Sequence, residues 1–92
     1  MAELLRAGTQ SGFEAAALVD MLSKMPVTSP AAAGASQLIV AGDHASRFPV
    51  RLVAKDLGYA QALGNLPITQ AVAQRYEDAI ARGLQDQNLT VV

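Results

Sequence analysis

The spacing of the apolar residues is the feature that most constrains this chain. In several segments they recur at intervals of three and four residues, as on one face of an α-helix, and no segment alternates as a strand would. Glycines and prolines separate these segments. The pattern predicts an all-α fold, a small multi-helix domain over residues 1–92, with major helices near residues 12–25, 30–41, 49–63 and 67–82.

Local signals predict where these helices begin and end. A short helix over residues 2–7 is expected to precede the four major ones. The candidate ends are Gly8, Gly42 and Gly83, and the candidate starts are Ser11, in a capping box with Glu14, and Ser29, before Pro30. Gly58 falls in mid-helix, where it is about 1 kcal/mol less favourable than Ala. We therefore expect a neighbouring backbone to approach it closely.

The apolar stripes predict a core. Alanines inflate the hydrophobic fraction of 51%, so the core is expected to be thin. The side chains expected to be mostly buried are Leu18, Leu22, Leu38, Val53, Leu57, Val72, Tyr76 and Ile80.

Composition excludes several classes of function. A net charge of −1 argues against a cationic surface for nucleic acid. The chain has no cysteine and one histidine, so we expect no metal site. No apolar run approaches the ~20 residues of a membrane span, and the N-terminus carries an acid where a signal peptide carries bases. We therefore expect no membrane association and a cytoplasmic location.

The surface is poor in charge, which suggests a partner. Charged residues make up 16% of the chain, compared with about 25% in a typical domain. Such a surface is often covered in part by another protein or domain.

The residues alone indicate little chemistry. His44 is the only histidine, a residue type often used as a general base, but a solvated loop histidine is the simpler interpretation. Lys55 and Asp56 lie at the edge of an apolar helix face, where the alternative is a pair of solvated charges. Tyr59 and Tyr76 are expected to be partly buried packing residues.

One stretch carries a more specific signal. Phe48, followed seven residues later by Lys55-Asp56-Leu57 and then Gly58-Tyr59-Ala60, resembles the β-hydroxyacid dehydrogenase family. The C-terminal helical domain of that family carries a Lys-Asp-Leu-x-x-Ala signature. Ser29-Pro30, Leu66-Pro67-Ile68-Thr69 and the polar ending over residues 83–90 agree in order and spacing, so the resemblance covers roughly residues 3–92.

The resemblance implies a fold and a function. The fold would be that of the C-terminal domain of 6-phosphogluconate dehydrogenase-like enzymes. The full enzyme would use NAD or NADP to transfer hydride on a short 3-hydroxy acid. Phe48, Lys55 and Asp56 would border the cofactor. Phe48 would exclude water beside the nicotinamide, Lys55 would place a positive charge near the cofactor or a substrate carboxylate, and Asp56 would orient Lys55 or the family's catalytic lysine.

The resemblance also implies what lies outside this chain. The Rossmann domain with its Gly-rich fingerprint would be supplied in cis or in trans, and the catalytic lysine would lie upstream of Met1. We therefore expect no catalytic residue here and no turnover by the chain alone, and we expect the isolated chain to bind NAD(P)H weakly or not at all, with no cofactor bound to it. The segment 61–66 is shorter than in the family, which puts a helix end and its loop in doubt.

Partners follow from the same reasoning. A homodimer is expected to bury Leu4, Leu5 and the exposed faces of the helices that contain Phe13 and follow Pro49. The alternative function is a non-catalytic helical module for protein interaction or dimerisation.

Overall fold

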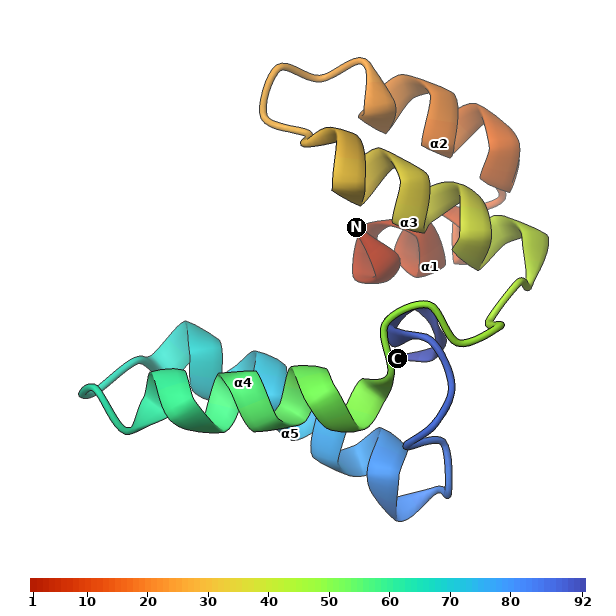
Figure 1. Cartoon of the computed structure of the whole chain (residues 1–92). Coiled ribbons are helices and arrows are strands. Elements are labelled where there is room, and N and C mark those ends of the chain that lie inside the picture. The colour runs from red at the N-terminus through yellow and green to blue at the C-terminus, as the bar shows by residue number, and fades with distance from the viewer. The chain divides into compact units, whose positions relative to one another are not determined.

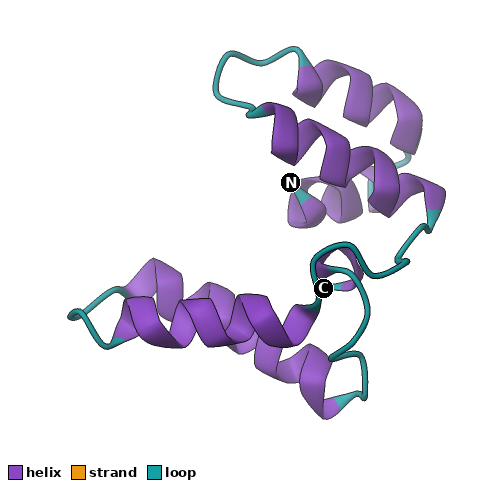
Figure 2. Ribbon diagram, in the orientation of Figure 1, coloured by secondary structure: helices purple, strands orange, loops and turns teal.

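A computed structural model describes residues 1–92 and contains helices and loops but no strand (Figure 1, Figure 2). The elements are α1 (Ala2–Gln10), α2 (Ala15–Ser23), α3 (Pro30–Ala41), α4 (Val50–Gln61), α5 (Pro67–Ala81) and the 3₁₀ helix η1 (Leu89–Val91). The all-α prediction is confirmed. None of the helices combines the length and the apolar character that crossing a bilayer requires.

The chain divides into two packing units, an N-terminal unit of residues 1–43 and a C-terminal unit of residues 44–92. In the N-terminal unit, α2 and α3 form an antiparallel pair and α1 packs against α2 (Figure 1). In the C-terminal unit, α4 and α5 lie side by side and antiparallel. The assignment of residues 1–92 to one domain stays a prediction.

The core of the N-terminal unit is small. Its buried apolar residues are Leu5, Leu18, Val19 and Leu22, with Met1 and Ile39 packed against them. Gly8 lies where α1 meets α2, and a Cβ added there would come 2.5 Å from the Cδ1 of Leu18. This glycine therefore permits close packing inside a helix, and the prediction that it ends the first helix is wrong.

The C-terminal unit buries one residue of each long helix completely, Val50 of α4 and Ala79 of α5. Tyr76 is half-buried, and this burial raises the pKa of its phenol above the ordinary value of 10.0. A Cβ added at Gly58 would meet no atom within 4 Å, so the expected close approach of a neighbouring backbone is absent.

The eight residues predicted to be buried fall into three groups by their exposure in the structure. Leu18 and Leu22 are buried as predicted. Val72 is 42% exposed, so its prediction is wrong. The other five are half-buried: Leu38, Val53, Leu57, Tyr76 and Ile80. A helical stripe identifies the apolar face of a helix but not how far a partner covers it, and the first half of α5 is left uncovered at Ile68 and Val72.

Three helices end in the same way, at a glycine with positive φ. Gly12, Gly42 and Gly83 have φ values of 91°, 65° and 78°. In each case the next N–H donates to a carbonyl five residues back, for example Phe13 to Gly8 and Asp43 to Leu38. This is the Schellman pattern, which confirms Gly42 and Gly83 as helix ends and adds Gly12.

The predicted helix starts have different outcomes. Ser29 caps α3, with its Oγ accepting from the N–H of Ala32 at 3.1 Å. The capping box at Ser11 does not form, because the Ser11 hydroxyl donates to the Ala7 carbonyl at the end of α1. The N-cap of α2 is Glu14, with no side-chain cap.

Candidate functional site

The C-terminal segment (residues 84–92) returns to the start of α4 and caps it (Figure 1). The N-cap residue of α4 is Pro49, which offers no side-chain acceptor. Instead, the carbonyls of Gln87 and Gln85 accept from the N–H groups of Val50 and Arg51, each at 3.0 Å. Backbone donors that a helix start normally leaves to a side chain or water are therefore satisfied by a segment distant in sequence.

Asn88 lies at the centre of this contact. It is 3% exposed, and its Oδ1 accepts from the N–H groups of Phe48 at 2.8 Å and Arg47 at 3.3 Å. Because backbone N–H groups can only donate, the atom facing them is the amide oxygen. The Nδ2 of Asn88 donates to the Thr90 Oγ1 at 3.0 Å.

His44 belongs to the same network. Its Nδ1 lies 2.9 Å from the Thr90 Oγ1, and its carbonyl accepts from the Asn88 N–H at 3.1 Å. The ring is half-buried. His44 therefore lies in a loop, as expected, but it is only partly exposed, and its Nδ1 is engaged in a structural hydrogen bond with Thr90.

The structure places Phe48 immediately before α4. Its N–H donates to Asn88, and its carbonyl accepts from the Leu89 N–H at 2.8 Å. The side chain is nevertheless 45% exposed. A large apolar ring is thus presented to the exterior from a backbone held on both sides.

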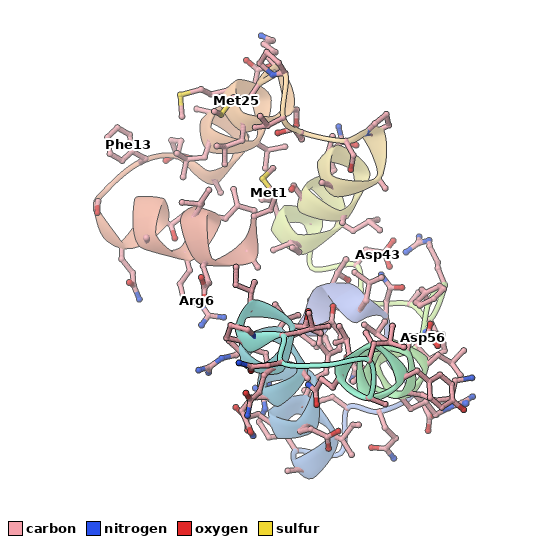
Figure 3. All side chains as sticks on the ribbon, turned by 90° about the vertical axis from the view of Figure 1, so that its left-hand side faces the viewer. Met1, Arg6, Phe13, Met25, Asp43 and Asp56 are labelled. Carbon is pink, nitrogen blue, oxygen red and sulfur yellow. The ribbon has the colours of Figure 1, made fainter.

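Lys55 and Asp56 are exposed on α4. Figure 3 looks nearly along this helix and labels Asp56. Successive helical residues point about 100° apart, so the two charges diverge from the helix axis. The Lys55 ammonium lies over the Tyr59 ring, 5.9 Å from its centroid. The structure therefore brings Lys55 to Tyr59 and Phe48 to Asn88.

The sequence pattern did not indicate all of this arrangement. Tyr59 was expected to be partly buried, but it is 67% exposed and serves as a platform for Lys55. Its position four residues after Lys55 was a usable signal for that contact. Asn88 and Thr90 were expected to belong to a polar tail. Their alternation with Leu89 is a weak signal that two polar side chains turn inward together.

One ion pair also joins the C-terminal segment to α4. The Arg51 Nε donates to the Asp86 Oδ1 at 2.9 Å, and both side chains are more than half exposed. Solvent screens such a pair, so the buried network around Asn88 contributes more to holding the segment.

The chain offers only part of what a dinucleotide requires. Residues 1–92 contain no strand, so they do not form the strand–loop–helix unit that holds a pyrophosphate at a helix N-terminus. They do carry an exposed aromatic ring just before α4, and an exposed cation and an exposed carboxylate on α4 itself.

One known protein family matches this chain over its whole length. A family model described as "NAD-binding of NADP-dependent 3-hydroxyisobutyrate dehydrogenase" matches residues 1–92. No curated protein matches the chain.

Proposed function

The chain belongs to the family of NAD-binding domains of NADP-dependent 3-hydroxyisobutyrate dehydrogenase, and from this membership we propose that it forms the helical wall of a nicotinamide cleft. The enzyme it serves is an NADP- or NAD-dependent oxidoreductase that transfers hydride on a short 3-hydroxy acid. In that reaction, hydride would pass from the carbinol carbon of the hydroxy acid to the nicotinamide of the bound oxidised cofactor, and the hydroxyl proton would leave to a base.

One observation in the structure carries the proposal. The Phe48 ring is 45% exposed, although both backbone polar groups of that residue are hydrogen-bonded to the C-terminal segment. An apolar ring on a backbone held in this way suits the face of a nicotinamide ring, because it excludes water and does not compete for the polar groups of the cofactor.

The neighbouring charges have complementary roles in this proposal. Lys55 attracts a substrate carboxylate or a cofactor phosphate, and the Tyr59 ring beneath it limits the conformations of its ammonium. Asp56 balances the positive charge that gathers in the cleft, either that of Lys55 or that of the lysine that serves as general acid and base.

We place the dinucleotide-binding sheet and that lysine outside residues 1–92, in cis or in trans. In the absence of both, the chain alone turns over no substrate and binds NADPH weakly.

A second function has its own support. Twelve large apolar side chains are at least 39% exposed, including Leu63 at 87% and Val27 at 86%. Such surfaces also suit a non-catalytic interaction module. This module would show no selective response of Phe48 to a nicotinamide cofactor.

A single-tryptophan experiment distinguishes the two functions. The chain has no tryptophan, so Phe48→Trp introduces one reporter beside the proposed cleft. Phe13→Trp is the matched control, because Phe13 is 63% exposed and its ring points away from the helices (Figure 3). Reduced nicotinamide quenches indole fluorescence at close range.

We expect NADPH to quench the reporter at position 48 with a Kd on the order of 1 mM, and the control only by light absorption. Equal quenching of the two variants, or none at position 48, would contradict the site. Micromolar binding would contradict the placement of most cofactor contacts outside this chain. A parallel titration with NADH tests the choice of cofactor.

A further inference from the structure

Asn88 is too buried to touch a cofactor, but it holds the residue proposed to do so. At 3% exposure it has no surface to offer a ligand. Its Oδ1 accepts from the N–H groups of Phe48 and Arg47, which spans 40 residues of sequence in one case and 41 in the other. Asn88 can therefore influence the cleft only through the residues that it holds, of which Phe48 is the one proposed to face the cofactor.

The hold on Phe48 is two-sided. Asn88 bonds its N–H at 2.8 Å, and the next residue, Leu89, donates to its carbonyl at 2.8 Å. Consecutive residues of the C-terminal segment thus bind both backbone groups of one residue. A displacement of the segment would move the Phe48 ring with it.

Thr90 fixes the orientation of the Asn88 amide. Its Oγ1 accepts from the Asn88 Nδ2 at 3.0 Å and lies 2.9 Å from the His44 Nδ1. Thr90 is itself 4% exposed. The amide plane is therefore held at both ends, by backbone donors on one side and by Thr90 on the other.

We propose that Asn88 is a positioning residue, which sets the place and order of the Phe48 ring in the nicotinamide cleft through this network. The proposal rests on the function proposed above for Phe48. It makes the C-terminal segment part of the cofactor wall, although none of its buried side chains contacts the ligand.

Three substitutions separate positioning from general packing. Asn88→Asp keeps an acceptor for the two N–H groups, and its second oxygen accepts from the Thr90 hydroxyl. Asn88→Leu keeps the branched shape of the side chain, with two larger methyl groups, but removes the acceptor. Asp86→Asn is the control in the same segment, because it weakens only the exposed pair with Arg51.

The first readout needs no ligand. We expect Asn88→Leu to speed hydrogen exchange at the Phe48 amide about tenfold or more, while Asn88→Asp and the control stay within about threefold of the parent chain. In the Phe48→Trp background, Asn88→Leu is expected to lower the fluorescence anisotropy of the reporter, and Asn88→Asp to restore it. Should Asn88→Leu unfold the C-terminal unit, Thr90→Val gives the milder test, with faster exchange at Phe48 in a folded chain.

The second readout is quenching by NADPH in the same background. It is expected to weaken in Asn88→Leu and to persist in Asn88→Asp. Unchanged hydrogen exchange and anisotropy in Asn88→Leu would overturn the positioning role. An equal change of these quantities in Asn88→Leu and Asn88→Asp would overturn it too. If NADPH does not quench the tryptophan of the Phe48→Trp chain with Asn88 intact, the proposed function fails. Hydrogen exchange and fluorescence anisotropy still decide whether Asn88 orders residue 48.

Discussion

Gly8 and Gly34 both lie inside helices of the N-terminal unit, but they have different surroundings. A Cβ at Gly8 would meet three atoms of the buried Leu18 within 3.4 Å, whereas a Cβ at Gly34 would meet nothing within 4 Å. The first glycine therefore leaves room for Leu18, which would have to shift if a Cβ were added, whereas the second only weakens its helix.

Alanine at these two positions should change stability in opposite directions. Gly34→Ala should raise the free energy of unfolding by about 0.5–1 kcal/mol through helix propensity. Gly8→Ala should lower it by about 1 kcal/mol, because the contact with Leu18 outweighs the same gain. Urea unfolding followed by circular dichroism measures both. Stabilisation by both substitutions would show that Leu18 moves aside freely.

Tyr76 makes the stability of the C-terminal unit depend on alkaline pH. Burial raises its pKa in the folded chain above 10.0, while the unfolded chain ionises near the ordinary value. Above pH 10 the folded state then binds more protons than the unfolded state. The resulting stability is full below pH 10 and is lost as pH rises through the folded-state pKa.

Tyr76→Phe should remove this dependence. Tyr59→Phe provides the background, because it leaves Tyr76 as the only tyrosine. The urea midpoint of this background should fall from just below pH 10 to about pH 11 more steeply than that of the doubly substituted chain. Equal slopes in the two chains would mean that Tyr76 ionises without cost in the folded state.

At the scale of the element, helix ends decide where the chain turns. α1, α3 and α5 each end at a glycine with positive φ, followed by an N–H that bonds five residues back. α3 also begins at a side-chain cap, Ser29, so both of its ends are specified locally.

Substitutions at Gly42 test whether a helix end of this kind requires a glycine. Gly42→Ala should lower the free energy of unfolding by about 1 kcal/mol, since alanine is strained at a φ of 65°. Gly42→Asn should cost less, because asparagine tolerates the left-handed region. Thermal unfolding of the two variants gives the order. An equal cost for both would place the effect in a lost contact rather than in backbone conformation.

The helices could be predicted because their signals are local. Ser29, Gly42 and Gly83 mark their ends with their own chemistry, and the periodic stripes locate the bodies between them. Ser11 could not be assigned in this way, since its hydroxyl suits either the start of one helix or the end of another. Its donation to Ala7 depends on where α1 stops, which Gly12 determines.

The site depended on contacts that no local pattern contains. Phe48, Lys55 and Asp56 were identified by resemblance, and their role stays a prediction. The bonds of Asn88 to Phe48 and of Thr90 to His44 join residues 40 and 46 positions apart. A single sequence does not indicate which distant positions are in contact. The hydrogen bonds that hold the backbone of Phe48 were therefore found only in the structure.

At the scale of the whole molecule, we propose that the chain self-associates. Charged residues make up only 16%, and Leu4 and Phe13 are 57% and 63% exposed. Leu5, which was expected in the interface, is 4% exposed within its own unit and is removed from the proposal. A shallow apolar hollow of about 260 Å³, lined by Val19, Val40 and neighbouring residues, adds to the exposed apolar surface.

Sedimentation equilibrium tests this proposal. At protein concentrations of about tens of micromolar, we expect a monomer–dimer equilibrium that Leu4→Glu and Phe13→Ser shift toward monomer. A clean monomer over this range would remove self-association as the reason for the charge-poor surface.

We propose that Phe48, Lys55 and Asp56 face a nicotinamide cofactor, and an amide NMR titration tests this placement most directly. With NADPH at millimolar concentrations, we expect the largest amide chemical-shift changes at these three residues and Tyr59. Their dependence on NADPH concentration should fit a Kd of about 1 mM. The matched titration with the adenosine half alone should leave them unchanged. Shifts concentrated in the N-terminal unit, or none at residues 48, 55 and 56, would contradict the account.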